Sequence, residues 1–383
     1  MRILIAHSFY RRPGGEDSYV RRQVQLLQGR HEVALVAREN TDSSPTVRTA
    51  AAMVYSPRRR QEIEAAIRDF DPDVIHLHNA YPGWGPAVHL AADHTRTPLV
   101  MTVHNLRLRC PNGLMFTEGE LCRRCTGGVY LHGVVHRCFE SRGQATAYAT
   151  SLWLHRFPGR LERRVARFIA PSRFMAQRLG EWGFEPDKVK LVRSFSGTVA
   201  EADAARAPEK TYGLFLGRLS SEKGPDVLLD ALSAAGDPPF RIVGGGSLLE
   251  VLRTRAQTLG LRNLTIEGWV EPSRARVELD RAQYLVLPSV CEENAPLAAL
   301  DSLGCGKPVI VSDRGGLPEL ADGGRGLVTR AGDVHDLAAA VRRLAEDPRA
   351  CVEMGRAGAL FARRHLTPQA HLDALENVYS TAA

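Results

Sequence analysis

The chain has 383 residues, of which 44% are hydrophobic and 24% are charged, and its formal net charge is +7. This length suits two domains of ordinary size, and the composition is that of a soluble globular protein. No apolar run approaches the roughly 20 residues that a membrane-spanning helix needs. The first residues predict a strand rather than a signal peptide, so we expect a cytoplasmic protein. The positive charge is consistent with nucleic acid, anionic lipid or nucleotide phosphates as partners, and does not choose among them.

Short apolar runs alternate with amphipathic stretches through the first half of the chain. We expect strands at residues 1–6, 33–36, 74–78, 99–103, 169–172 and 189–192, and helices at residues 18–27, 56–70 and 143–168. This alternation predicts a parallel sheet covered by helices. Residues 194–209 are rich in Ser, Ala and Glu and lack periodicity, which predicts an inter-domain linker.

The same rhythm returns in the second half. We expect strands at residues 212–216, 241–243, 264–267, 285–287 and 309–311, and helices at residues 333–346 and 351–365. Two such halves predict an α/β protein of two Rossmann-like domains, at residues 1–193 and 210–366, followed by a helical tail at residues 367–383.

Small and polar residues follow three predicted strands of the first half, at the end where open α/β sheets bind ligands. They are Gly14 and Gly15, His78 and Asn79, and His104 and Asn105. The glycine pair lies between a strand and a helix, which suits either the close approach of a phosphate or a plain tight turn. A histidine at a strand end either faces a ligand or has a structural role, with its hydrogen bonds made inside the protein.

Residues 105–142 form a long connection with little periodicity, which needs a function or a constraint to justify it. The segment contains Cys110, Cys122, Cys125 and Cys138, spaced C-x11-C-x2-C-x12-C. Four thiolates at such spacing suit a structural zinc ion without an open coordination position, and a reducing compartment argues against two disulfides. His132 and His136 are alternative ligands. The remaining alternative is four reduced cysteines in a loop.

Basic and aromatic residues gather at the end of the helix expected at residues 143–168. The patch that they form, with Leu154 among them, contains Trp153, Leu154, His155, Arg156, Phe157, Arg160, Arg163, Arg164 and Arg167. Such a face either rests on anionic membrane, at about 1 kcal/mol per cation, or is simply solvated.

Charged residues mark two strand ends of the second half. Arg218 and Lys223 lie five residues apart across a strand-to-helix turn, where both can lean over one anion. Glu293 precedes a predicted helix that has Pro296 in its first position and Asn294 as its cap. Asp301 lies eight residues after Glu293, inside that helix, so the two carboxylates suit two sets of hydroxyls on one extended ligand.

The segment at residues 285–320 and the sequence GRLSSEKG at residues 217–224 resemble the family 4 glycosyltransferases, which are retaining enzymes with the two-domain GT-B fold. The family motif runs Glu, seven residues, Glu and then Cys-Gly-x-Pro, and the matching residues here are Glu293, Asp301, Cys305, Gly306 and Pro308. Asp301 departs from the second Glu of the family. Its side chain is one methylene shorter, so it must lie closer to the ribose that it is expected to hold.

The resemblance implies two facing domains with a nucleotide-sugar in the cleft between them, and a terminal helix that crosses back to the first domain. Arg218 and Lys223 would neutralise the donor phosphates, so that no catalytic metal is required. The Asp71-Pro72-Asp73 sequence resembles the metal-binding pair of other glycosyltransferases, but it stands before its strand, so we interpret it as a turn. Arg218 and Lys223 form the expected catalytic set with Glu293 and His104. The expected donor-binding residues are Gly14, Gly15, Gly244, Gly246, Trp269, Val270, Asn294, Ala295, Pro296, Leu297 and Asp301. His78, Asn79 and Asn105 are expected on the acceptor side.

The sequence therefore predicts a retaining transferase that moves a hexose-type sugar from a nucleotide diphosphate to a glycan, a lipid-linked or a small-molecule acceptor, in bacterial surface polysaccharide assembly. It would be cytoplasmic, with peripheral membrane contact left open. One rival is another GT-B enzyme, such as a sugar-nucleotide epimerase or a phosphorylase. The other is a zinc-containing nucleic-acid-binding protein. Two features argue against it: the cations are dispersed along the chain, and few aromatic residues are available to stack on bases.

Overall fold

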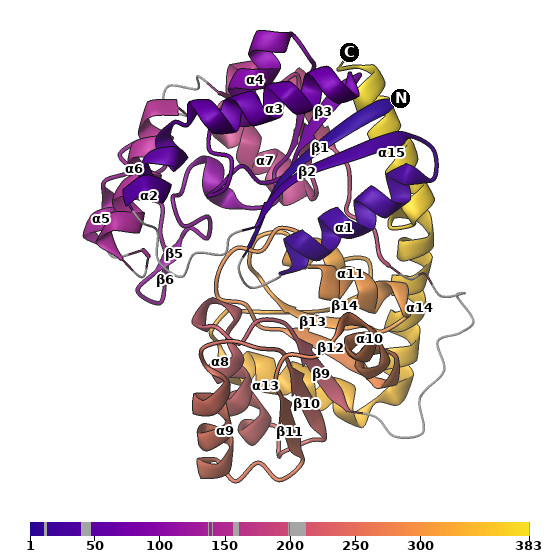
Figure 1. The fold of residues 1–383 in the computed structure, drawn as a ribbon. Coiled ribbons are helices and arrows are strands. Elements are labelled where there is room, and N and C mark those ends of the chain that lie inside the picture. The colour runs from indigo at the N-terminus through magenta and orange to yellow at the C-terminus, as the bar shows by residue number, and fades with distance from the viewer. Residues whose placement is uncertain are drawn as a thin grey trace. The chain divides into compact units, whose positions relative to one another are not determined.

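The computed structural model describes residues 1–10, 14–39, 47–136, 138–139, 141–155, 161–197, 199 and 212–382, without the side chains of residues 47–50 and 155 (Figure 1). The chain divides into two compact units. The first contains Met1–Glu118, Cys122–Arg193 and His371–Ala383, and the second contains Ser194–Ala370 and Gly119–Leu121. Most of the predicted linker, at residues 198 and 200–209, lies outside the described residues.

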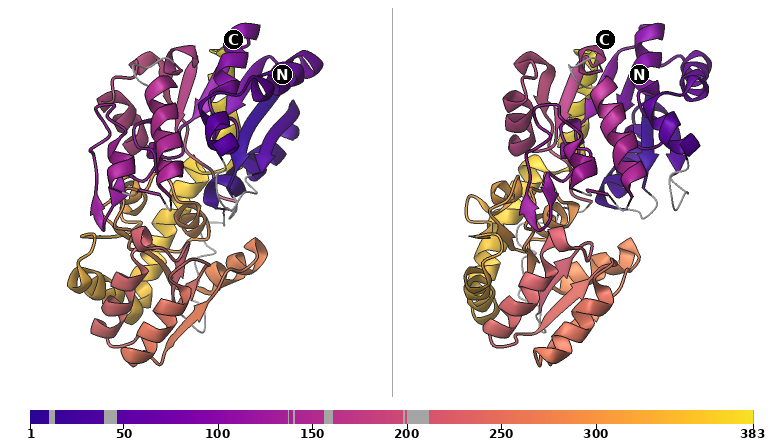
Figure 2. Two further views of the ribbon diagram at one scale, coloured as in Figure 1. Left: turned by 60° about the vertical axis from the view of Figure 1, so that its left-hand side comes forward. Right: turned by 90° about the vertical axis from the view of Figure 1, so that its left-hand side faces the viewer.

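The first unit is built on a six-stranded parallel sheet. Its strands, in spatial order, are β2 (Glu32–Glu39), β1 (Arg2–Phe9), β3 (Val74–Leu77), β4 (Leu99–Thr102), β7 (Arg167–Ala170) and β8 (Val189–Leu191). Every residue of β3 and β4 is buried, because helices cover both faces of a parallel sheet (Figures 1 and 2). Each of these short apolar runs therefore lacks the polar alternation of a half-exposed strand.

Helices surround this sheet and one of them comes from the end of the chain. They are α1 (Gly15–Gln28), α2 (Val47–Val54), α3 (Pro57–Phe70), α4 (Ala87–Thr95), α5 (His132–Val135), α6 (Arg142–His155), α7 (Arg173–Glu181) and α15 (Pro368–Ser380). Nδ1 of His371 on α15 lies 2.7 Å from the Arg193 carbonyl, and the Tyr379 hydroxyl lies 2.7 Å from Nδ1 of His76. These buried polar contacts fix the register of α15 in the first unit.

The second unit has another six-stranded parallel sheet. Its strands, in spatial order, are β11 (Leu264–Glu267), β10 (Phe240–Val243), β9 (Gly213–Leu216), β12 (Tyr284–Leu287), β13 (Val309–Ser312) and β14 (Gly326–Thr329). The helices are α8 (Pro225–Ala234), α9 (Leu249–Thr258), α10 (Pro272–Arg281), α11 (Leu297–Gly304), α12 (Leu317–Ala321), α13 (Val334–Glu346) and α14 (Pro348–His365). Figure 2 shows that they, too, cover both faces of their sheet.

Each sheet has one point at which its winding reverses. In the first unit this point lies between β1 and β3, and in the second it lies between β9 and β12. At such a point the loops on the two neighbouring strands turn away from each other, so a crevice opens at the carboxyl ends of the strands. The strand order alone therefore predicts where each unit binds a ligand.

Two sequence-based predictions about helices were wrong. The helix expected at residues 143–168 ends at His155 in the described part of the chain, and Arg167 and Phe168 belong to β7. Phe168 is buried and pairs with Met101 of β4, so tertiary packing decides its conformation. The helix after Glu293 begins at Leu297, with Pro296 rather than Asn294 as its N-terminal cap and without a capping side chain. An extended Pro296 (ψ 125°) stands outside the helical turn.

The insert between β4 and α6 contains little regular structure. A short 3-10 turn at Leu106–Leu108 is followed by the two-residue strands β5 (Phe116–Thr117) and β6 (Glu120–Leu121) and then by α5. Among the residues that the structure describes, no helix is both long and apolar enough to cross a bilayer.

Candidate active site

The loops at the reversal point of the second sheet bring three charged residues together. Arg218 follows β9, Lys223 ends a 3-10 turn (Ser221–Lys223) that leads into α8, and Glu293 follows β12. Since β9 and β12 are neighbours, residues 70 positions apart along the chain meet at one end of the sheet. The sequence alone placed these residues at strand ends, and the strand order brings those strand ends together.

Lys223 and Glu293 form a direct ion pair through Nζ and Oε1. The Ser289 hydroxyl also donates to Oε1 of Glu293, at 2.7 Å. Burial alone would raise the pKa of Glu293, but the Lys223 ammonium and the hydrogen bonds from Lys223 and Ser289 outweigh it, and the pKa falls below its usual value. Burial would likewise lower the pKa of Lys223, and the Glu293 carboxylate raises it instead. Both groups are therefore charged at neutral pH.

Arg218 is positioned by Glu222, a residue that the sequence analysis did not single out. Nη2 of Arg218 donates to Oε1 of Glu222 at 3.0 Å, and the Ser220 hydroxyl donates to the same oxygen at 2.6 Å. Glu222 is buried, while 58% of the Arg218 side chain is exposed. One face of the guanidinium is thus fixed by a carboxylate and the rest is open to an anion from solution. The only signal in the sequence was the spacing of four residues.

A close backbone approach holds the loop that carries Glu293. Gly316 N–H donates to the Glu293 carbonyl at 2.7 Å, and Gly315 lies beside it with φ +61°. A Cβ on Gly315 would lie 2.1 Å from that carbonyl oxygen, so no larger residue fits without a shift of the loop. The Gly-Gly sequence after β13 therefore supports the position of the carboxylate.

The other expected donor-binding residues are distributed around the same end of the second sheet. Gly244 and Gly246 follow β10 and lie against the loop after β9, since Leu219 N–H donates to the Gly245 carbonyl at 3.0 Å. Trp269 follows β11 and is 62% exposed, and Val270 is half-buried. Residues 294–297 connect Glu293 to the first turn of α11.

Asp301 is already engaged by the chain. Its Oδ1 accepts hydrogen bonds from the Ser196 hydroxyl at 3.0 Å and from Gly197 N–H at 2.8 Å. The residue expected to hold a ribose therefore fastens the start of the second unit to α11. A ligand hydroxyl at this carboxylate would share it with these two donors or displace them.

The first unit gathers a different set of groups at the reversal point of its sheet. The expected residues follow three neighbouring strands: Gly14 and Gly15 after β1, His78 and Asn79 after β3, and His104 and Asn105 after β4. His78, Asn79, His104 and Asn105 line one cavity of about 20 Å³, together with Arg107. Asn79 also has structural contacts, because its amide donates to the Ser8 carbonyl and accepts from Tyr81 N–H, both at 3.2 Å.

The histidines of this unit form a stacked series rather than isolated ligands. Nδ1 of His78 lies 2.9 Å from Nε2 of His104, and the two rings stack with centroids 5.2 Å apart. His76 also stacks on His78, with the ring centroids 4.2 Å apart. Burial, together with the charge that neighbouring histidines would carry, lowers the pKa values of His78 and His104 well below the usual value. Both imidazoles are therefore neutral at pH 7 and act as hydrogen-bonding groups.

Glu16 is a second functional candidate that the sequence analysis missed. Its Oε2 accepts from the Asn105 amide at 3.1 Å and from the Tyr10 hydroxyl at 3.2 Å. Its Oε1 is buried and has no hydrogen-bond partner among the residues that the structure describes. Burial raises the pKa of Glu16, although His7, Arg107 and Asn105 act in the opposite direction. The available signal was its place directly after the Gly14-Gly15 turn.

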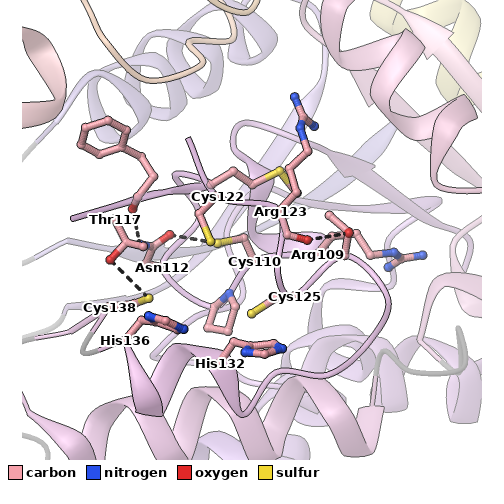
Figure 3. A pocket seen from close by; sticks show the side chains of 14 residues that line it. Arg109, Cys110, Asn112, Thr117, Cys122, Arg123, Cys125, His132, His136 and Cys138 are labelled. Carbon is pink, nitrogen blue, oxygen red and sulfur yellow. Dashed lines mark hydrogen bonds between the residues drawn. The ribbon is translucent and has the colours of Figure 1, made fainter. Parts of the chain in front are cut away.

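The four cysteines of the insert line a second pocket of the first unit, and Figure 3 shows them around it with His132 and His136.

The basic patch is only partly described, since residues 156–160 and the side chain of His155 lie outside the described residues. Within it, Arg164 Nε lies 3.0 Å from Asp93 Oδ2, and Arg167 donates to the Ala166 carbonyl at 2.8 Å. These two cations have internal partners, whereas Trp153 is 59% exposed.

Two family models match the chain in succession. Residues 13–194 match the model described as Glycosyltransferase Family 4, and residues 200–361 match the model described as Glycosyl transferases group 1. The chain belongs to the family 4 glycosyltransferases. The resemblance of the Glu293 and Arg218 segments to this family is confirmed, and so is the enzyme class.

Several curated relatives of this glycosyltransferase are named D-inositol 3-phosphate glycosyltransferase. The one from Thermomonospora curvata is 32% identical over 56% of this chain and 57% of its own length. The one from Segniliparus rotundus is 23% identical over 92% of this chain and 81% of its own length. A GDP-mannose-dependent alpha-(1-6)-phosphatidylinositol monomannoside mannosyltransferase from Mycolicibacterium smegmatis is 30% identical over 42% of this chain and 47% of its own length. For several relatives, the matched region spans only about half of the relative's length.

Solved structures agree with this glycosyltransferase in fold. A sucrose-phosphate synthase from Thermosynechococcus elongatus has a TM-score of 0.73 at 18% identity, covering 99% of this chain and 98% of its own. Anabaena Alr3699/HepE in complex with UDP has a TM-score of 0.70 at 16% identity, and covers both chains completely. The predicted GT-B fold class is confirmed.

Proposed function

We propose that this glycosyltransferase moves a hexose-type sugar from a nucleotide diphosphate to a hydroxyl acceptor, with retention of the anomeric configuration. One observation carries the proposal: Arg218, Lys223 and Glu293 meet at the reversal point of the second sheet. Two cations suit a diphosphate, and a carboxylate beside them suits the hydroxyls of the attached sugar. The proposed donor site thus lies within one unit.

In the proposed reaction, the bond between the anomeric carbon and the diphosphate oxygen breaks, and its electron pair goes to the diphosphate. The acceptor hydroxyl oxygen forms the new bond to the anomeric carbon on the face that the diphosphate leaves, and its proton passes to the released diphosphate. Arg218 and Lys223 offset the charge that builds on this leaving group, as donors do in an oxyanion hole. The Arg218 guanidinium and the Lys223 ammonium supply this charge without a divalent ion, so we propose that transfer needs no catalytic metal. Glu293 accepts hydrogen bonds from the sugar once Lys223 turns toward the phosphates.

The acceptor is proposed to bind at the polar end of the first sheet. His104 is neutral there, and its partner His78 limits the ring to orientations that keep the 2.9 Å contact. A neutral imidazole of this kind can accept or donate one hydrogen bond to a sugar hydroxyl. His78, Asn79 and Asn105 line the same cavity, and Glu16 lies behind Asn105.

The acceptor class is proposed by analogy and from charge. Relatives are named for acceptors bearing inositol phosphate or phosphatidylinositol mannoside. We propose a glycan, a lipid-linked or a small-molecule acceptor, with bacterial surface polysaccharide assembly as the setting. Contact with the inner face of the membrane through the basic patch stays a prediction, which the internal partners of Arg164 and Arg167 weaken.

A thermal-shift panel of UDP-, GDP- and dTDP-sugars tests the donor half of the proposal. At least one nucleotide-sugar should raise the unfolding temperature, and Lys223→Ala should abolish that rise. Arg253→Ala is the matched control, because Arg253 forms an exposed ion pair with Glu250 in the same unit. No response across the panel would contradict the proposal. Formation of an epimer without acceptor, or phosphate-dependent cleavage, would favour a different GT-B reaction.

A further inference from the structure

None of the residues proposed to act on the donor lies in the cysteine-bearing insert, and two of the insert's backbone turns begin at cysteines. Two of them begin equivalent turns: Gly113 N–H donates to the Cys110 carbonyl, and Gly128 N–H donates to the Cys125 carbonyl, both at 3.0 Å. Both glycines have positive φ, at +77° and +88°. The same Cys-x-x-Gly turn therefore occurs twice in the insert.

Backbone hydrogen bonds also hold the other two cysteines of the insert. Cys138 N–H donates to the Gly133 carbonyl at 3.1 Å, and Gly133 N–H donates to the Tyr130 carbonyl at 3.0 Å. The Cys122 N–H donates to the Met115 carbonyl at 2.7 Å, which holds Cys122 close to the turn that begins at Cys110.

The side chains converge on a single pocket. Cys110, Cys122, Cys125 and Cys138 all line it, with His132 and His136 of the α5 region on one side (Figure 3). Its volume is about 10 Å³, roughly the room that one water molecule or one ion occupies. The three other cysteines lie in the second unit, so the four insert cysteines are the thiols of the first unit.

In the structure, two of the four thiols form hydrogen bonds with side chains other than cysteines. Cys110 Sγ donates to Asn112 Oδ1 at 3.0 Å, and Cys138 Sγ to Thr117 Oγ1 at 3.7 Å. In the described part of the chain, no three His, Cys, Asp or Glu side chains are close enough together to hold a metal ion. Ligation therefore requires the thiols to rotate from these partners toward the pocket, while the backbone turns keep their place.

The charges nearby suit a tetrathiolate ion. One Zn²⁺ with four thiolates carries two negative charges, and Arg124 Nη1 already lies 3.8 Å from Cys122 Sγ. Arg109 and Arg123 line the same pocket. We propose that Cys110, Cys122, Cys125 and Cys138 bind one zinc ion, releasing four protons, and that this ion fixes the insert.

The zinc site would act on the acceptor side of the proposed function rather than on the donor side. The insert begins at Asn105 and Arg107, which line the cavity that contains His78 and His104. A zinc ion that fixes the insert therefore fixes this wall of the cavity. Arg218, Lys223 and Glu293, which carry the proposed donor site, belong to the second unit, so zinc removal should leave nucleotide-sugar binding unchanged.

Metal analysis of the full chain tests the site. Protein prepared under reducing conditions is incubated with zinc chloride, desalted and measured by elemental analysis, and one equivalent of zinc per chain is expected. Cys125→Ser should lose the ion, and Cys351→Ser, which changes a buried thiol of the second unit, should keep it. Zinc retained equally by Cys125→Ser, or absent from the unaltered chain, would overturn the proposal.

Cobalt substitution covers the case in which a cysteine variant fails to fold. The unaltered chain loaded with Co²⁺ should show thiolate charge-transfer absorption and tetrahedral d–d bands, and His132→Ala with His136→Ala should preserve both. Loss of these bands in the histidine variant would overturn the four-cysteine ligand set. Disulfides found by alkylation and mass spectrometry without reductant would overturn zinc binding itself. A nucleotide-sugar thermal shift on chelated protein separates this proposal from the proposed function.

Discussion

The polar ends of the two sheets have the same topology, but different kinds of groups face each other there. In the second unit, ionised partners face each other across the reversal point, with Lys223 against Glu293 and Arg218 against Glu222. In the first unit, buried imidazoles stack in series, and burial keeps His78 and His104 neutral. The same loop geometry can therefore present either fixed charge or neutral hydrogen-bonding groups, according to which residues follow the strands.

This difference matches the two parts of a glycosyl transfer. A diphosphate leaving group needs charge that is in place before the bond breaks. A sugar hydroxyl needs donors and acceptors without a net charge that would bind phosphate instead. We therefore expect substitutions in the second unit to act by removing charge from the donor site. Substitutions in the first unit should act by changing the orientation of the acceptor or the protonation of buried histidines.

The largest expected effect concerns the ion pair of the second unit. Lys223→Met should lower the free energy of unfolding by roughly 3 kcal/mol, because it leaves the mostly buried Glu293 carboxylate without its partner. Urea denaturation measures this loss. Arg253→Ala should cost less than about 1 kcal/mol, since its ion pair is exposed. The double variant Lys223→Met with Glu293→Gln should recover most of the loss; an undiminished loss would show that the pair is not coupled.

A change in the first unit should separate transfer from donor binding. His104→Ala should reduce transfer about 10²-fold, equivalent to about 2.7 kcal/mol, because the acceptor loses an orienting group. The affinity for the responding nucleotide-sugar, measured by calorimetry, should stay within about twofold. Arg218→Ala should instead weaken donor binding. If His104→Ala weakened donor binding as strongly as Arg218→Ala, the division of roles would be wrong.

The backbone that supports Glu293 offers a smaller test. Gly315→Ala should destabilise the chain by roughly 2 kcal/mol, since it combines a left-handed backbone with a Cβ contact of 2.1 Å to the Glu293 carbonyl. Gly236→Ala is the matched control, because Gly236 has φ +89° and no atom of the described residues lies within 4 Å of the added Cβ. Equal losses in urea denaturation would mean that the contact is relieved at little cost.

The smallest effect is on the pH dependence of stability. Burial lowers the pKa of His371 to about 4 and that of His76 to about 3, against an unfolded value of about 6.5. Below pH 6.5 the unfolded chain takes up protons that the folded chain refuses, so the free energy of unfolding falls as the pH falls from about 6.5 to about 4. His371→Gln should reduce that slope by up to about 1.4 kcal/mol per pH unit.

Denaturation in urea at several pH values measures the slope. His94→Gln is the control, because 64% of the His94 side chain is exposed. An unchanged slope in His371→Gln, or an equal change in His94→Gln, would contradict the assignment of the acid sensitivity to the buried histidines.

Local patterns in the sequence predicted much of the architecture. The strand at residues 264–267 matches β11, and the helices expected at residues 56–70 and 333–346 match α3 and α13 within one residue. Ser56 caps α3 and Asp333 caps α13, so these helices carry their own start signals. The prediction failed where such a signal was lacking, as at Arg167 and Phe168, where pairing with β4 outweighs the local preference.

The sequence by itself determined which residues end each strand, because apolar runs, glycines and charged groups are local features of the chain. Only the tertiary structure decided which strand ends are neighbours, and with them the partners of Lys223, Arg218 and His104. Glu222 and Glu16 became visible only there, since a buried carboxylate is recognised by the donors around it. Hydrogen bonds and ion pairs between distant residues depend on strand order, which no local pattern encodes.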